Sequence, residues 1–135
     1  MTRKLLIILC LALTLAGCIS VAGKKSTAKK GVEFAKGTVV DGFPNMPLYP
    51  KSRVIETYGE GKKFGGTFYS GEKLAKVVGF YQTTLTQSGW EVAARQVSQS
   101  NFVFDVKNTA SVGSVIVNTA GDGKQTAITI WVEPR

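Results

Sequence analysis

The residue types that usually carry chemistry are sparse in this chain, and histidine is missing altogether. Histidine is the commonest general base and the commonest metal ligand, so its absence removes most ordinary acid–base and metal sites. A serine nucleophile would then need a lysine as its base. One such spacing exists, Ser70 followed by Lys73, but Ser70 also precedes a helical pattern, where serine is a good N-cap. We expect Ser70 to cap a helix and not to act as a nucleophile.

The acidic residues are scattered and do not suggest a catalytic pair, which requires two carboxyl groups in one cleft. Asp105 is the most notable, because it lies in an apolar stretch. Strand alternation places it on the face opposite Phe102 and Phe104, in solvent. The sequence therefore predicts a protein that is not an enzyme and has no metal site and no cofactor. The acids considered are Glu56, Glu60, Glu72, Glu91, Asp105, Asp122 and Glu133.

The chain begins with a segment organised like a secretory signal peptide. Arg3 and Lys4 precede an apolar run over residues 5–15, and two small residues lead to Cys18. The run is well short of the roughly 20 residues that a membrane-spanning helix needs. Cys18 therefore lies at the junction between an apolar leader and a polar segment, whereas Cys10 lies inside the leader and is given no role.

Leu15-Ala16-Gly17-Cys18 resembles the lipobox of bacterial lipoproteins, in which Leu, a small residue and Gly or Ala precede Cys. The resemblance implies that residues 1–17 are a leader cleaved before Cys18, with Leu15, Ala16 and Gly17 recognised by the signal peptidase. It also implies that Cys18 carries diacylglycerol on its sulfur and often a further acyl chain, such as palmitate, on its amino group. Two or more chains anchor a protein stably, whereas one gives marginal binding.

Residues 18–41 have the composition of a flexible tether, with too few apolar residues to offset the entropy of ordering. The chain has a net charge of +8. Lysines next to a lipid anchor contribute about 1 kcal/mol each near an anionic surface. Four of the lysines of this segment, which lie within seven residues of one another, are therefore possible contacts for anionic lipid or an envelope polymer, and a solvated spacer is the alternative. No nucleic-acid partner is expected, since no RNA-binding aromatic motif accompanies the lysines, which are Lys24, Lys25, Lys29 and Lys30.

Residues 42–135 are predicted to form a single domain. A proline-rich entry over 43–50 precedes strands over 52–58 and 64–69, and Gly65-Gly66 predicts a bulge or bend in the second strand. A helix over 70–88 follows, and Gly89 is placed to end it. Four further strands are predicted over 90–97, 101–107, 112–118 and 126–132. The helix is recognised by apolar residues at spacings of three and four, which are Leu74, Val77, Val78, Tyr81 and Leu85.

The order β-β-α-β-β-β-β predicts an α+β fold, with an antiparallel sheet of about six strands and one helix packed on one face. The other face is then partly wet, paired with a partner or shielded by the proline-rich entry. Pro47-x-Tyr49-Pro50, Phe80-Tyr81, Leu85 and Gly89-Trp90 make the segment similar to a small α+β domain of bacterial secreted lipoproteins. That domain has a Y-P entry, a helix with F-Y-x-x-x-L and a G-W that starts the next strand. The resemblance implies fold and compartment, and no activity.

Phe80 and Trp131 fall off the expected buried faces and are a possible interaction surface. The expected function is that of a membrane-anchored envelope lipoprotein, with a non-enzymatic domain that binds or scaffolds an unidentified envelope protein. The alternative is a small-molecule or lipid carrier. Cys18 is followed by Ile19 and Ser20, so the inner-membrane retention signal, an aspartate, is missing. An outer-membrane position facing the periplasm is expected if the source has two membranes, and otherwise the outer leaflet of the cytoplasmic membrane.

Overall fold

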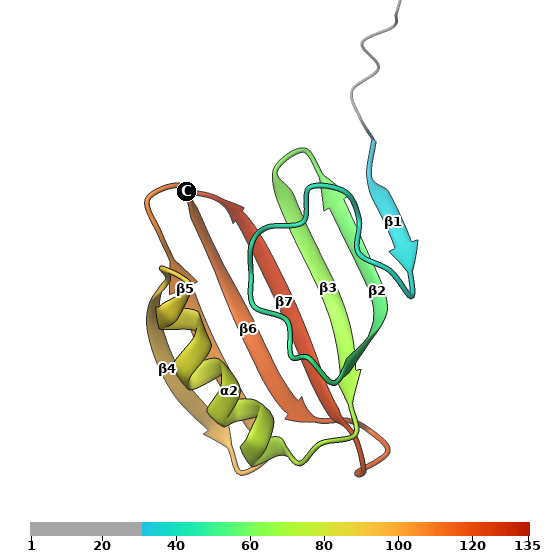
Figure 1. Cartoon of the computed structure of the whole chain (residues 1–135), viewed down its shortest axis with the longest axis vertical. Helices are drawn as coiled ribbons and strands as arrows, with labels where there is room; N and C mark the ends of the chain where they lie inside the picture. Colours follow the sequence, from blue (N-terminus) through green and yellow to red (C-terminus); the bar gives the residue numbers. More distant parts are fainter. Residues whose placement is uncertain (1–30) are drawn as a thin grey trace, which may run out of the picture.

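Seven strands pair into one antiparallel sheet within residues 31–135, the part of the chain that the computed structural model describes. Their order is β1-β2-β3-β7-β6-β5-β4, and a single helix of these residues, α2, lies on one face (Figure 1). The predicted α+β fold is confirmed, with one strand more than expected. The elements are β1 (Glu33–Lys36), β2 (Ser52–Glu60), β3 (Lys63–Ser70), α2 (Leu74–Gln87), β4 (Glu91–Ser98), β5 (Asn101–Lys107), β6 (Ser111–Thr119) and β7 (Thr126–Pro134).

The position of α2 explains the order of the strands. β2 and β3 form a hairpin, after which α2 carries the chain to the far edge of the sheet, where β4 begins. The chain then returns through three consecutive antiparallel pairings, and β7 closes the sheet by pairing with β3. Phe68 and Ile128 are partners in that closing pair, and both are buried. The centre of the sheet therefore joins residues that are far apart in the sequence.

Helix α2 buries the predicted stripe against the sheet and ends as predicted. Gly89 has a φ of 85°, a conformation that glycine adopts without strain. The N–H of Trp90 donates to the carbonyl of Leu85 at 3.2 Å, which satisfies one of the carbonyls left free at the end of a helix. The buried residues are Val77, Val78, Tyr81 and Leu85.

The start of the helix differs from the prediction. Lys73 occupies the N-cap position, and its side chain makes no capping hydrogen bond within the described residues. Ser70 is instead the last residue of β3, and its Oγ accepts a hydrogen bond of 3.1 Å from the N–H of Glu72. The predicted N-cap at Ser70 is therefore wrong, because residues 71–73 are used to turn the chain from the sheet into the helix.

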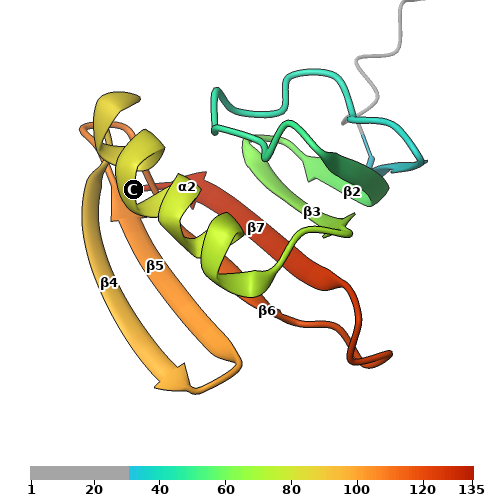
Figure 2. The same cartoon turned by 60° about the horizontal axis from the view of Figure 1, so that its bottom comes forward.

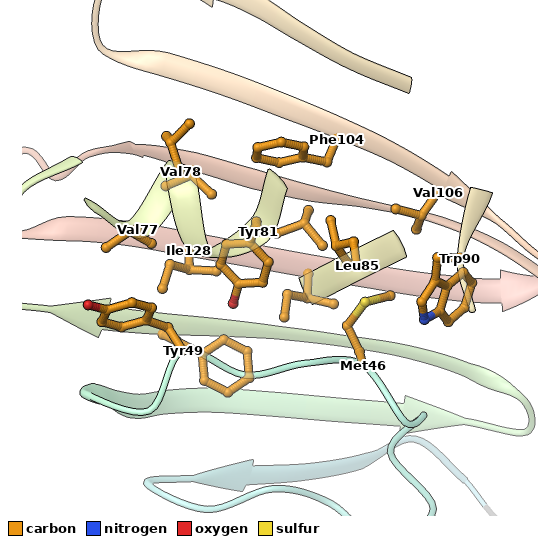
Figure 3. Close-up of a cluster of buried hydrophobic side chains, with 14 of the residues drawn as sticks. Met46, Tyr49, Val77, Val78, Tyr81, Leu85, Trp90, Phe104, Val106 and Ile128 are labelled. Carbon is orange, nitrogen blue, oxygen red and sulfur yellow. The ribbon is translucent and has the colours of Figure 1, made fainter. Parts of the chain in front are cut away.

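The hydrophobic core lies between the sheet and a layer made of α2 and the proline-rich entry (Figure 2). Met46 and Tyr49 of the entry reach the same cluster as Tyr81 of α2 and Ile128 of β7 (Figure 3). The entry thus covers the half of the sheet that α2 leaves bare. It cannot shield the other face, and no helix or loop of residues 31–135 covers that face (Figures 1 and 2).

The domain begins earlier than residue 42, its predicted first residue. β1 pairs with β2, and Val40 is only 4% exposed. The N–H of Val40 donates to the Thr57 Oγ1 at 3.0 Å, and that hydroxyl donates to the carbonyl of Thr38, also at 3.0 Å. Residues 33–41 therefore belong to the sheet domain. A strand of four residues carries too little alternation to be recognised in a lysine-rich segment.

The bulge predicted at Gly65-Gly66 lies elsewhere. The register shift is in β2, between Val54 and Glu56, and β3 pairs regularly with both neighbours through the two glycines. Gly65 has a different role. The ring of Tyr58 lies over it, and a methyl group at this position would overlap that ring. The Tyr58 side chain therefore lies across the backbone of β3 on the uncovered face.

Candidate functional site

The uncovered face of the sheet, opposite α2, carries the most unusual set of side chains in residues 31–135. We call it the open face. One residue from each strand lines up across it, and each is the register partner of the next. We call this line the cross-strand row. It consists of Phe34, Tyr58, Gly65, Trp131, Ser114, Asp105 and Ala93, from β1 to β4 in spatial order.

Aromatic side chains make up one half of the cross-strand row. Phe34 is 55% exposed, Tyr58 44% and Trp131 37%. Gly65 separates Tyr58 from Trp131, and the Tyr58 ring covers it. The two rings therefore flank a position without a side chain of its own. These are the three aromatic side chains of residues 31–135 that are exposed to solvent.

A hollow of about 560 Å³ lies on the open face beside Trp131. The indole and Val112 line it from β7 and β6, and Ala93 contributes only a methyl group from β4. Gly113 lines the hollow with its backbone. It pairs with the buried Val106 and Val132, so a methyl group there would point to the α2 side and overlap the carbonyl oxygen of Trp131. The hollow exists because small residues lie among long ones on neighbouring strands.

Two ion pairs border the hollow. The Arg95 Nε lies 3.1 Å from the Asp105 Oδ2, and the Lys107 Nζ lies 3.1 Å from the Glu91 Oε2. All four groups are solvent-accessible, so each pair adds little stability. Each carboxylate still has lone pairs and each cation still has N–H donors for a ligand. The local charges cancel, so the site has both donors and acceptors without a net attraction for anions or cations.

Ser114 stands between Trp131 and Asp105 in the cross-strand row. It is 2% exposed, and its Oγ has no hydrogen-bond partner within residues 31–135. Leaving a buried hydroxyl unpaired costs about 1–3 kcal/mol. A water molecule or a ligand hydroxyl could pair with it, as could also be the case for Asn101 Oδ1, another buried atom without a partner in residues 31–135.

The two aromatic residues proposed from the sequence as an interaction surface do not lie together. Trp131 is on the open face, as expected. Phe80 is half buried on the α2 side, where its ring packs edge-on against Tyr49 and Tyr81 with centroid distances of 5.1 Å. Tyr49 comes from the proline-rich entry, so helical periodicity alone could not reveal this contact.

Asp105 lies where alternation predicted it, exposed and opposite the buried Phe104. Tyr58 and Phe34 are the members of the site that the sequence reasoning missed. The sequence placed Tyr58 in a strand but did not indicate that its side chain is exposed. Phe34 was placed in the tether. The one available signal was Gly65, because a glycine inside a strand often marks the close approach of another group.

The lipidation and tether residues lie outside the described residues. This concerns Cys18, the recognition residues Leu15, Ala16 and Gly17, and the lysines Lys24, Lys25, Lys29 and Lys30. Over residues 31–135, no helix combines the length and the apolar character that crossing a membrane requires.

The acidic groups and the serine considered from the sequence lie in the following contacts. No three or more acidic or cysteine side chains of residues 31–135 come together as metal ligands. Hydrogen bonds from Lys76 and Lys51 lower the pKa of Glu72, and backbone N–H groups lower that of Asp122 in its turn. These carboxylates are stabilised as anions in structural roles. Ser70, the one serine at a Ser–Lys spacing, is 1% exposed.

Comparison of the chain with family models, with curated proteins and with solved structures found no match. The open face and the residues of the leader are therefore the features that bear on function.

Proposed function

We propose that this protein is a membrane-anchored envelope lipoprotein whose sheet domain is a non-enzymatic binding or scaffolding module. The observation that carries the proposal is the cross-strand row, which exposes Phe34, Tyr58 and Trp131 on one face. Burying an aromatic side chain contributes about 1.5–3 kcal/mol, and the domain forgoes about half of this at three positions of one row. Exposed apolar patches with a polar rim mark interaction sites.

The anchor is supported by Leu15-Ala16-Gly17-Cys18 at the end of the apolar leader. Acyl chains on Cys18 hold the protein at the membrane, and Lys24, Lys25, Lys29 and Lys30 add attraction to anionic lipid or an envelope polymer. The segment between Cys18 and Glu33 can extend to at most about 50 Å. The open face therefore works close to the membrane surface, facing the periplasm from the outer membrane, or on the outer leaflet of the cytoplasmic membrane where there is only one.

The alternative, a lipid or small-molecule carrier with its ligand between helix and sheet, has weaker support. That interface is filled by Tyr81, Leu85 and Phe104, each at most 1% exposed. The hollow on the α2 side is smaller, about 230 Å³, and the polar residues Gln82 and Gln96 line it together with Phe102 and Phe104. Such a lining does not suit an acyl chain, because a buried polar group needs hydrogen-bond partners that hydrocarbon lacks.

The anchor is tested with the full-length chain and its Cys18→Ser variant in a bacterium that processes lipoproteins. Membranes are washed at high salt, which screens the contribution of the lysines. We expect the unaltered protein to stay with the membrane as an acylated form beginning at Cys18, and the variant to be released or retained only through its uncleaved leader. A Cys18→Ser protein that lacks residues 1–17 and still sediments with washed membranes would refute the anchor.

The binding role is tested in the same cells with a photoreactive phenylalanine analogue at one position at a time. At position 58, on the open face, the analogue is expected to form adducts with another envelope component. At position 51, which is exposed on a different part of the domain, it is expected to form none. Equal labelling at the two positions would contradict a binding role for the open face.

A further inference from the structure

We propose that the hollow beside Trp131 binds a neutral carbohydrate, with the apolar face of one sugar ring seated on the indole. The inference rests on the proposed function, because it names the ligand class of the same open face. Three features of the site lead to it, namely the exposed indole, the balanced charges around it and the unpaired hydroxyl of Ser114.

The indole supplies a flat apolar platform at the edge of the hollow. Trp131 is 37% exposed, and the small residues Gly65 and Ser114 are its neighbours on either side. On the β6 side no large side chain prevents a ring from lying against the indole, while on the β3 side the Tyr58 ring lies over Gly65. A pyranose has one face formed by C–H groups, and such a face packs on an aromatic ring through dispersion and weak C–H contacts.

The charges around the hollow suit hydroxyl groups better than ions. Asp105 is paired with Arg95, and Glu91 with Lys107, at 3.1 Å in both cases. A charged ligand would lie near two carboxylates and two cations, so its attraction to one pair of groups is offset by repulsion from the other. A hydroxyl group donates to a carboxylate and accepts from a cation, so a neutral polyol satisfies both kinds of group at once.

Ser114 adds a hydrogen-bonding group between the indole and the first ion pair. Its Oγ is buried and has no partner in the described part of the chain. Trp131 and Asp105 are its cross-strand partners, and both are exposed. Ser114 is not itself part of the lining of the hollow, so a ligand hydroxyl reaches its Oγ only when these two side chains turn aside. The site thus offers stacking and hydrogen bonding side by side, the combination by which small-molecule sites fix orientation.

Two other ligands with flat or apolar surfaces fit less well. A single-stranded nucleic acid stacks on aromatic rows, but it needs a basic groove along its phosphates. A membrane surface attracts basic residues next to the inserted aromatics. Three cations of this face, Arg95, Lys107 and Lys63, are each within 4 Å of a carboxylate. Neither a polyanion nor an anionic bilayer is favoured by such a surface.

The test uses the full-length protein in detergent micelles and follows the indole N–H resonances of Trp131 and Trp90 by NMR. The probes are the trisaccharides of glucose and of N-acetylglucosamine, the anionic trisaccharide of galacturonic acid, a short oligothymidylate and anionic phospholipid vesicles. We expect at least one neutral trisaccharide to shift the Trp131 resonance in a saturable manner. The Trp90 resonance is expected to stay in place, because that side chain is 6% exposed in the core.

Three variants locate the binding. Trp131→Ala is expected to lower the affinity about tenfold or more, the effect of losing a central aromatic anchor. Ala93→Leu fills the hollow from the exposed edge strand β4 while keeping the indole, and is expected to weaken binding similarly. Val32→Ala is the control, because this apolar side chain is 62% exposed and directly precedes β1, which lies three strands from β7. Its loss is expected to leave trisaccharide affinity unchanged.

The proposal is overturned if no neutral trisaccharide moves the Trp131 resonance. It is equally overturned if Ala93→Leu leaves the affinity unchanged, or if the galacturonate, the oligothymidylate or the vesicles bind this face more tightly than any neutral sugar. Cys18→Ser separates this outcome from a failure of the anchor. That variant is expected to keep its sugar affinity even though it loses acylation.

Discussion

The contact between Tyr58 and Gly65 can be measured by combining two substitutions. A methyl group in Gly65→Ala overlaps the Tyr58 ring, so the ring must swing away. Tyr58 is 44% exposed, which means that about half of its side chain is buried. Since full burial of an aromatic contributes about 1.5–3 kcal/mol, the displaced ring loses roughly 1 kcal/mol.

The same substitution has a favourable effect that partly cancels this loss. Alanine is better than glycine inside a strand by about 0.5–1 kcal/mol. Gly65→Ala is therefore expected to be nearly neutral in the unaltered protein. In a Tyr58→Ala background no ring is displaced, so Gly65→Ala is expected to stabilise the fold by about 0.5–1 kcal/mol. The coupling free energy between the two positions is then about 1 kcal/mol.

The assay is urea denaturation of the four proteins of this double-mutant cycle, followed by circular dichroism. Gly79→Ala in both Tyr58 backgrounds is the control, because α2 lies on the other face and additive effects are expected for distant sites. If Gly65→Ala changes stability equally with and without the Tyr58 ring, within about 0.3 kcal/mol, the ring does not lie on Gly65 and the aromatic half of the cross-strand row is misplaced.

Three further predictions concern the body of the fold. Gly79→Ala is expected to stabilise the protein by about 1 kcal/mol in urea denaturation. Gly79 is inside α2 and no atom lies close to an added methyl group, so the usual helix preference for alanine applies. A destabilised variant would contradict the helix packing. Gly113→Ala is expected to lower the free energy of unfolding by about 2 kcal/mol or more in the same assay, because the methyl group meets the backbone of β7 and a packed sheet cannot relax freely. A neutral result would mean that β6 and β7 are farther apart. Burial raises the pKa of the Tyr81 phenol, so near pH 10 this group ionises only in the unfolded chain. The free energy of unfolding is therefore expected to be unaffected by Tyr81 below pH 10 and to fall by about 1.4 kcal/mol per pH unit above it. Tyr81→Phe should remove this part of the slope, and an identical slope in both proteins would refute the burial of that hydroxyl.

The fold was largely predictable because its local patterns and its packing agree. The apolar stripe that includes Tyr81 and Leu85 identified α2, and Gly89 identified its end. Alternation around Asp105 identified the two faces of β5 correctly. These features depend on residues within a few positions of one another, so the sequence displays them directly.

What could not be predicted depends on contacts between distant segments. β1 is held by pairing with β2 and by the hydrogen bonds between Val40 and Thr57, which nothing in the lysine-rich composition suggests. Phe80 is covered by Tyr49 of the proline-rich entry, so its place off the helix stripe did not make it exposed. The sequence likewise could not show on which face of the sheet that entry packs, because this depends on the tertiary structure.

The candidate site was found only in part for the same reason. Trp131 was recognised because its own strand alternates clearly. Its relation to Tyr58, Ser114 and Asp105 follows from the register of β3, β7, β6 and β5, and β7 reaches β3 only after the chain has crossed the sheet. A row that runs across strands is not visible along the chain.

The most direct test of a binding role for the open face is the rate at which Trp131 is oxidised by hydroxyl radicals. The rate is measured by mass spectrometry in intact envelopes and in the purified full-length protein in detergent. Trp90, which is 6% exposed, serves as the internal reference in both samples. An occupied face predicts that Trp131 is oxidised several times more slowly in the envelope, with Trp90 unchanged. Equal oxidation of Trp131 in the two samples would mean that the open face is as bare at the membrane as it is in isolation.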